Sequence, residues 1–224
     1  MRINAYLALA TSLSRRQADL AIQTGRVTVN GQTAVLGQLI GSNDIVGLDN
    51  RNIGLPSTRE LIMLNKPKGF VVSRKGQGNK TVYNLLPSTL KHLKPVGRLD
   101  KNSSGLLLMT NDGQLAWQLT HPSNSKTKRY KVSLDKPLKA HDLQKIQDGV
   151  ILEDGPSQLT ISDLTNQNRT MLISMHEGRN RQIRRTFTAL GYTVIELHRT
   201  HFAGYQLGDL ATGQWQKISG ICLI

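Results

Sequence analysis

A polar segment near residue 50 divides this 224-residue chain into two unequal parts. Residues 48–60 read LDNRNIGLPSTRE, which includes a glycine and a proline and shows no sustained apolar periodicity. Such a composition is typical of a linker. We therefore expect a small domain at 1–48, a linker at 49–60 and a larger domain at 61–224. Since 38% of the residues are hydrophobic, the chain can bury a core.

The net charge is the strongest bulk property of the sequence. The chain carries 29 Lys and Arg residues against 15 Asp and Glu residues, which gives +14 and a pI near 10.2. Such an excess favours a polyanionic partner, and nucleic acid is the first candidate. An anionic membrane is the alternative, but we find no long basic amphipathic helix, no lipidation motif and no apolar run of about 18 residues. We expect a cytoplasmic protein that does not bind membranes.

The first 48 residues show the pattern of two helices followed by a hairpin. Apolar residues recur at helical spacing over residues 3–10, and Ser14 with Gln17 forms a capping box that begins a second helix. Asn30 and Gly31 then supply a tight turn between two short strands. We expect a compact helical and hairpin domain.

Arg15 and Arg16 fall in the first turn of the second expected helix. The positive end of the helix dipole disfavours cations there, so the pair is better explained as facing an external phosphate. Solvated arginines on a helical hairpin are the alternative.

The larger domain alternates short strands and helices without the spacing of a parallel sheet. The fold class that this predicts is α+β, with a largely antiparallel or mixed sheet. We expect strands at 61–65, 69–73, 105–110, 127–134, 170–176 and 192–199, and helices near 113–121, 139–148 and 180–190.

Several kinds of chemistry lack the residues they need. The stretch Gly76–Lys80 does not have the spacing of a phosphate-binding loop, and no GxSxG motif is present. His198 and His201 would point to opposite faces of a strand, which does not suit zinc. The single Cys222 is expected to be a small buried apolar side chain. We expect no metal and no cofactor.

Asp100 occupies the most informative position in the chain. Residues 96–113 read VGRLDKNSSGLLLMTNDG, so this acid lies between a short apolar strand and a polar loop that leads into an apolar run. A carboxylate held between two buried segments is a rigidly placed reactive group. A surface salt bridge to Arg98 or Lys101 is the alternative.

The pattern GRLDxxSxGLLLxTNDG resembles the central motif of RNA pseudouridine synthases of the RsuA and RluB branch. Further segments resemble that family's motifs in the expected order, namely KPKG at 66–69, KRYKV at 128–132, EGRNRQIRR at 177–185 and LHRTHFAG at 197–204. The family usually has Thr where this chain has Ser103, so a hydroxyl is retained. The resemblance spans nearly the whole chain.

The N-terminal part resembles the small RNA-binding domain first described in a ribosomal protein of the small subunit. Its pattern is matched by SRRQAD at 14–19, by GRVTVNG at 25–31 and by Leu36-Gly37. The resemblance implies an RNA-binding domain joined to a catalytic domain of the pseudouridine synthase fold.

The family resemblance implies the roles of particular residues. Its catalytic residues would be Asp100, Tyr130 and Arg184. Its substrate-binding residues would be Arg98, Leu197, Lys66 and Ile183. The side chains expected to bind RNA are Arg15, Arg16, Arg26, Lys128, Arg129, Arg179, Arg181 and Arg185.

The chemistry of the reaction explains why such a set is needed. The bond from ribose C1' to uracil N1 breaks, the base rotates and it rejoins through C5, so no cofactor is required. An enclosed carboxylate stays ionised only with a cation within about 4 to 6 Å, and the resemblance assigns this cation to Arg184. Tyr130 would stack on the flipped uracil, which is worth about 1 to 3 kcal/mol. A phosphate contact for Arg184 and a core role for Tyr130 are the alternatives.

The substrate implied is ribosomal RNA or a pre-ribosomal particle, and the protein is expected to be a monomer. The segment GVILEDGPSQL at 149–159 and the EGRNR form favour the large-subunit 23S RNA over the small-subunit 16S RNA. A non-catalytic RNA-binding or ribosome-assembly factor would explain the charge equally well, but not the match to a catalytic set.

Overall fold

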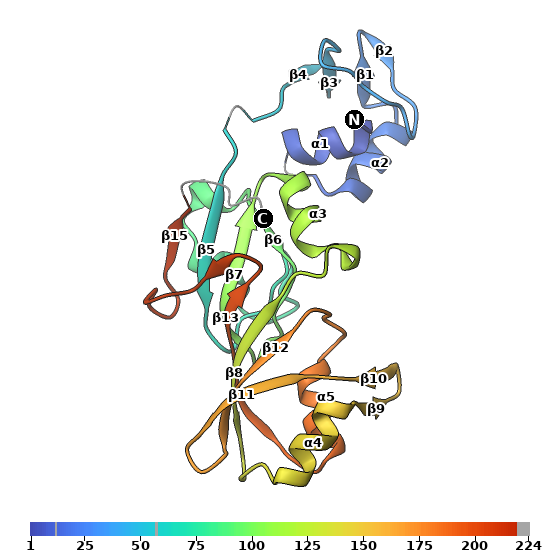
Figure 1. Ribbon diagram of the computed structural model, residues 1–224. Helices are drawn as coiled ribbons and strands as arrows, with labels where there is room; N and C mark the ends of the chain where they lie inside the picture. Colours follow the sequence, from blue (N-terminus) through green and yellow to red (C-terminus); the bar gives the residue numbers. More distant parts are fainter. Residues whose placement is uncertain (12, 57, 219–224) are drawn as a thin grey trace. The chain divides into compact units, whose positions relative to one another are not determined.

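The computed structural model describes residues 1–11, 13–56 and 58–218, which form two compact units (Figure 1). One unit comprises Met1–Arg59 with Asn111–Gly113, and the other comprises Glu60–Thr110 with Gln114–Ile224. Cys222 lies outside the described residues. No helix in the described ranges is long and apolar enough to cross a membrane.

The smaller unit contains two helices and a four-stranded sheet. The helices are α1 (Ile3–Ala10) and α2 (Arg15–Gln23), and the strands are β1 (Val27–Val29), β2 (Gln32–Thr33), β3 (Val46–Leu48) and β4 (Arg51–Ile53), in the sheet order β2-β1-β3-β4. The predicted capping box is confirmed, since the backbone N–H of Gln17 donates to Ser14 Oγ and that of Ser14 donates to Gln17 Oε1. Asn30 and Gly31 both have positive φ, as the predicted hairpin turn requires.

Part of the expected linker is folded. Residues 51–53 form β4, which pairs with β3 in antiparallel register, and Ile53 packs against the core of the smaller unit. The assignment of 49–60 as a linker was therefore wrong for this strand. The sequence did not predict this strand because, of its three residues, only Ile53 is apolar and packs against the core.

The larger unit is built on one mixed sheet. Its strands are β5 (Leu61–Lys66), β6 (Lys94–Val96), β7 (Ser104–Thr110), β8 (Lys128–Leu134), β11 (Thr160–Thr165), β12 (Thr170–Met175), β13 (Val194–Phe202), β14 (Tyr205–Gln206) and β15 (Trp215–Lys217). Their order is β11-β12-β8-β13-β7-β5-β15, with β14 paired to β13 and β6 paired to β7. A separate hairpin joins β9 (Val150–Leu152) to β10 (Gly155–Ser157).

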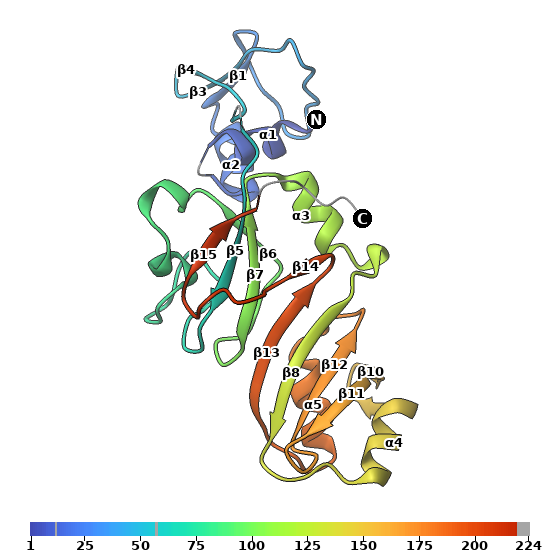
Figure 2. The same cartoon turned by 60° about the vertical axis from the view of Figure 1, so that its left-hand side comes forward.

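The helices of the larger unit cover both faces of this sheet. They are α3 (Gly113–Thr120), α4 (Ala140–Asp148) and α5 (Gln182–Ala189), with short 3-10 turns at Val82–Leu85, Ser88–Leu90 and Pro122–Asn124. Helices α4 and α5 pack in a cluster with alternate residues of β8, β12 and β13 (Figures 1 and 2). Helix α3 packs in a second cluster with the opposite face of β5 and β7. The α+β class with a mainly antiparallel mixed sheet is confirmed.

A short parallel pairing between β13 and β7 joins the two halves of the sheet. It consists of His198 beside Ser104 and Arg199 beside Gly105. Gly105 has φ +103, and a Cβ there would lie 2.3 Å from the carbonyl oxygen of Arg199. This glycine is needed because the two backbones approach too closely for any side chain.

The predicted strand at 69–73 is wrong. Gly69 has φ +89 and its N–H donates to the carbonyl of Lys101 (2.8 Å), so the chain turns out of the sheet after β5. Val71 then forms a single bridge with Thr81. The other predicted strands and the three predicted helices are present, with ends that differ from the prediction by at most three residues. The short apolar strand expected before Asp100 is β6. The strands β9, β10, β11, β14 and β15 were not predicted, because brief or edge strands carry little periodicity.

Candidate active site

Asp100 lies on the loop between β6 and β7. Its side chain is 35% exposed, and its carboxylate Oδ2 lies 3.8 Å from Nη1 of Arg181. The loop is closed on itself by the N–H of Ser103, which donates to the carbonyl of Asp100 (3.1 Å). The acid is therefore reachable from solvent and lies beside a guanidinium.

The buried side chain of Lys66 holds the loop that carries Asp100. Its side chain is fully buried, and its ammonium donates to the carbonyls of Ser103 (2.6 Å), Asp100 (3.0 Å) and Pro67 (3.0 Å), with Lys101 at 3.5 Å. The expectation that Lys66 binds substrate was wrong, because no part of its side chain reaches the surface. Its contacts make it a positioning residue for the acid.

The buried ammonium of Lys66 is electrostatically coupled to the site. The pKa of Lys66 is lowered from 10.5 to about 8, chiefly by burial; the negative charge of Asp100 opposes this shift, and the positive charge of Arg199 adds to it. A lysine with such a pKa is still mainly protonated at neutral pH. The loop therefore keeps its cation under ordinary conditions and loses it in mild alkali.

Arg184 also binds the loop that carries Asp100. Its Nη1 donates to the carbonyl of Val194 (2.8 Å) and its Nη2 to the carbonyl of Asn102 (2.9 Å). Arg184 was expected to supply the cation beside Asp100, but among the described residues the ion pair to that acid comes from Arg181. The two groups still interact, since Asp100 raises the pKa of Arg184 while burial and Arg181 lower it more strongly.

Arg181 is aimed at the site by an unusual backbone conformation. It precedes the first turn of α5 and has φ 48° and ψ 30°, the left-handed region that non-glycine residues seldom occupy. Such a conformation costs about 1 to 3 kcal/mol and clusters at functional sites. Arg181 was expected among the phosphate-binding arginines, but the structure places it beside Asp100.

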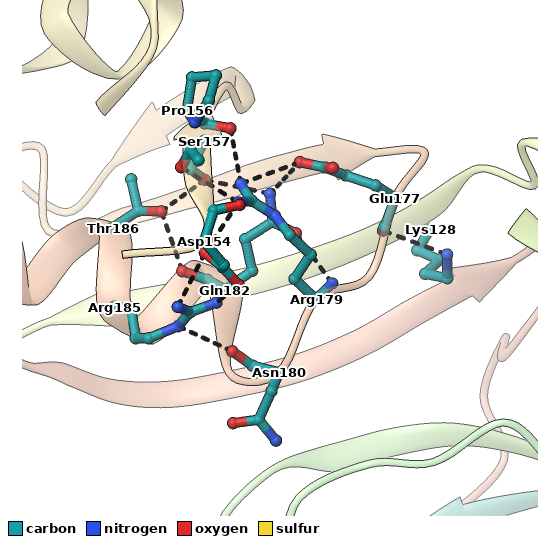
Figure 3. Close-up of polar contacts among 11 residues, drawn as sticks. Lys128, Asp154, Pro156, Ser157, Glu177, Arg179, Asn180, Gln182, Arg185 and Thr186 are labelled. Atoms are coloured by element: carbon teal, nitrogen blue, oxygen red, sulfur yellow. Dashed lines mark hydrogen bonds and ion pairs between the residues drawn. The ribbon is translucent and has the colours of Figure 1, made fainter. Parts of the chain in front are cut away.

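Arg179 and Arg185 are engaged by Asp154 of the β9–β10 hairpin (Figure 3). Arg185 donates to both carboxylate oxygens (3.0 and 2.7 Å), and Arg179 donates to Oδ1 (2.9 Å) and to the carbonyl of Pro156 (2.7 Å). These two arginines were expected to bind RNA. Their guanidinium groups hold the region of α5 to the hairpin, whereas Arg181 and Arg184 contact the acid and its loop.

Replacing Asp154 by Asn should lower kcat several-fold while RNA affinity stays equal or rises. The change keeps the shape, removes the charge that fastens α5, and releases two guanidinium groups toward solvent. The pKa of Asp154 is held below 3.8 chiefly by its bond with Arg185, so its stabilising effect is present above that value and is lost as the pH falls. Thermal unfolding of the two proteins should therefore differ at pH 7 and converge in acid. Asp163→Asn, at an exposed position of β11, is the matched control, and equal losses in both variants would contradict the role of Asp154.

The remaining predicted pocket residues lie in one apolar cluster. Tyr130 on β8, Leu197 on β13 and Ile183 on α5 are each less than a tenth exposed and pack in the cluster that also contains Leu99, the neighbour of Asp100. Arg98 is exposed on the other side of that leucine. The cluster supplies an apolar wall for the site.

A hollow of about 380 Å³ shares Arg181 and Arg184 with the surroundings of the acid. It is lined by Arg181, Arg184 and Arg185 of the α5 region and by Ile151, Leu152 and Glu153 of β9, with Thr188 and Ala189. Ile151 is 76% exposed. An exposed apolar residue beside the guanidinium groups of Arg181 and Arg184 suits a nucleic-acid chain, which has both phosphates and base faces.

The other predicted RNA-binding residues differ in whether their charges already have a partner in the protein. Arg15 and Arg16 are exposed and have no ion-pair partner within the described part of the chain. Arg26 is paired with Asp49 (Nη2 to Oδ2, 2.5 Å), and Lys128 donates to the carbonyls of residues 176 and 177. Arg129 is exposed on β8.

Sequence reasoning missed Asp154 and the carbonyl of Asn102 as parts of this site. An acid followed by glycine in an otherwise basic chain was the available signal for Asp154. Nothing in the sequence marks a backbone carbonyl as the partner of an arginine 82 residues away.

This arrangement defines a protein that presents a carboxylate beside guanidinium groups and an apolar wall. The chain belongs to the RNA pseudouridylate synthase family, whose model matches residues 60–189, and it is an RNA pseudouridine synthase. It is 34% identical to the ribosomal large subunit pseudouridine synthase B of Bacillus subtilis, over 97% of this chain and 92% of the relative. It is also 34% identical to the ribosomal small subunit pseudouridine synthase A of Pasteurella multocida, over 98% of this chain and 96% of the relative.

A solved structure supports the same assignment. A crystal structure of a pseudouridylate synthase superposes with a TM-score of 0.71 at 29% identity, over 98% of this chain and 96% of that chain. The similarity extends over both units of the chain.

Proposed function

We propose that this enzyme converts one uridine of ribosomal RNA to pseudouridine in the cytoplasm, with Asp100 as the catalytic residue. The observation that carries the proposal is the placement of the Asp100 carboxylate 3.8 Å from Arg181, on a loop held by Lys66 and Arg184. Attack on C1', attack on uracil C6 and removal of a sugar proton all need an ionised carboxylate in a fixed position. Arg181 places a positive charge beside the carboxylate, and Arg184 and Lys66 hold the loop that carries it.

Tyr130 is proposed to lie against the flipped uracil. It is 8% exposed and shares its cluster with Leu99, Ile183 and Leu197. Stacking on an aromatic ring is worth about 1 to 3 kcal/mol, close to the few kcal/mol that extruding a base costs. We also propose that its hydroxyl assists proton transfer at uracil C5, since the hydrogen on C5 must leave when the new bond forms there.

The large-subunit RNA is the first candidate substrate and the small-subunit RNA the second. Relatives with either specificity are 34% identical to this chain, so identity supports both.

Release of tritium from transcripts tritiated at uridine C5 tests the proposal directly. We expect release from the 23S transcript. Release from the 16S transcript alone would change the substrate, and release from neither would favour a non-catalytic RNA-binding factor.

We also propose that the smaller unit binds RNA through α2. Arg15→Gln with Arg16→Gln should lower the slope of log affinity against log salt by about 1.4 to 1.8, since each phosphate contact contributes about 0.7 to 0.9. Arg26→Gln is the control, because Asp49 already balances that charge. Filter binding to the rRNA transcript across a salt series measures both. A double variant with the slope of the parent would remove the RNA-binding role of α2.

A further inference from the structure

The larger unit has a second hollow, of about 440 Å³, lined by polar side chains from several strands. Lys131 comes from β8, His198 and Glu196 from β13, and Ser104 from β7. Lys68 follows β5, and Pro67 and Thr212 complete the lining. None of these residues has a role in the reaction described above.

The second hollow lies on the face of the sheet opposite Tyr130. Tyr130 and Val132 are buried in the cluster beneath α5, so Lys131 between them points to the other face. The register places His198 beside Lys131 on one side and beside Ser104 on the other. These three side chains therefore stand in a row across three neighbouring strands.

The cations of the second hollow are not neutralised by the protein. Lys131 has no ion pair in the part of the chain that the structure describes, and Lys68 donates to the carbonyl of Ile195 (3.2 Å). The carboxylate of Glu196 makes no ion pair within 4.0 Å among the described residues. Burial holds the pKa of His198 below 6.5, and both lysines act in the same direction against Glu196. The field in the hollow is thus positive despite one acid.

The same hollow offers hydrogen-bonding groups as well as charge. Ser104 Oγ lies 2.9 Å from Nδ1 of His198, so the hydroxyl and the ring are held together at its floor. Ser104 is 8% exposed. A tetrahedral anion takes hydrogen bonds from hydroxyl, imidazole and ammonium groups in such a cluster.

We propose that this hollow binds a backbone phosphate of the substrate RNA, outside the modified nucleotide. Backbone contacts link the hollow to the surroundings of Asp100. Lys68 of the hollow donates to the carbonyl of Ile195, and Arg184 donates to the carbonyl of the preceding residue, Val194. The two bonds thus end on neighbouring peptide groups at the start of β13. The inference rests on RNA being the substrate and holds for either ribosomal RNA.

Equilibrium binding of a labelled single-stranded oligoribonucleotide tests the site without turnover. Lys68→Gln with Lys131→Gln should weaken binding and lower the salt slope by about 1.4, which is about 0.7 per contact. Lys80→Gln with Lys91→Gln removes the same charge from exposed positions of the same unit and should change the slope by less than half as much. Equal slopes in the two double variants would overturn the proposal.

Glu196→Gln gives a second test of opposite sign. Removing the one acid from the hollow should tighten oligoribonucleotide binding about two- to fivefold, whereas Asp209→Asn at an exposed position should leave it unchanged. Weaker binding in Glu196→Gln would show that the acid contacts the RNA and would contradict a phosphate site.

Inorganic phosphate distinguishes a free anion from an RNA phosphate. We expect millimolar phosphate to leave the His198 ring signals in place, and the oligoribonucleotide to shift them in the parent but not in the double lysine variant. A shift with phosphate alone, unaffected by RNA, would assign the hollow to a free anion instead. Because neither binding nor these signals requires turnover, failure of this site is distinguishable from failure of the proposed activity.

Discussion

Asp100→Asn should reduce tritium release at least a thousandfold while RNA affinity stays within a few-fold of the parent. The amide keeps the size of the side chain but supplies no negative charge, and a thousandfold loss corresponds to about 4 kcal/mol of barrier. Affinity should persist because the cationic surface is unchanged, and the loss of one acid beside Arg181 removes no attraction for phosphate. Single-turnover release and filter binding on the same transcript measure the two quantities.

The matched control for this change is Asp163→Asn, at an exposed position where the register of β11 is irregular. It removes the same charge far along the chain from the site and should turn over like the parent. If Asp100→Asn retained turnover near that of the parent, the assignment of the catalytic residue would fail. A parallel loss in both variants would point to net charge instead.

Lys66→Met should lower kcat about a hundredfold with little change in RNA affinity. Methionine matches the length of the lysine chain but cannot donate to the carbonyls of Asp100 and Ser103, so the loop loses its anchor. A displacement of about 1 Å at a reacting group is enough for such a loss. The change also leaves buried carbonyls unpaired, each at about 1 to 3 kcal/mol, so the melting temperature should fall as well.

The pH profile separates a positioning role from a general loss of stability. Burial lowers the pKa of Lys66 from 10.5 to about 8, so the folded protein releases this proton in mild alkali while an unfolded chain would keep it. We expect kcat of the parent to decline above about pH 8, as the loop loses the ammonium. The residual activity of Lys66→Met should lack that decline. The same alkaline limb in both proteins would show that another group is responsible.

The outcome for Arg184 shows how far a motif can carry a geometric prediction. The sequence motif placed this arginine near the acid, and the structure does bring it to the loop of Asp100. It binds the carbonyls of Asn102 and Val194, while Arg181 makes the ion pair. The motif was sufficient for the neighbourhood but not for the partner, because several guanidinium groups on one short segment reach the same region.

The sequence alone determined the features that depend on neighbouring residues. The capping box of Ser14, the turn at Asn30 and Gly31, and the position of Asp100 between two apolar segments all follow from local rules of backbone geometry and burial. The α+β class follows from the order of such segments.

Only the tertiary structure decided which distant groups meet. Lys66 reaches the carbonyl of Asp100 across 34 residues, and Arg185 reaches Asp154 across 31. The sequence does not distinguish these residues from a surface lysine or arginine. Apolar periodicity indicates which side of a helix or strand is buried, but not which other element covers that side. Burial by the rest of the fold therefore made Lys66 an internal anchor, and Asp154 ties Arg179 and Arg185 to the β9–β10 hairpin.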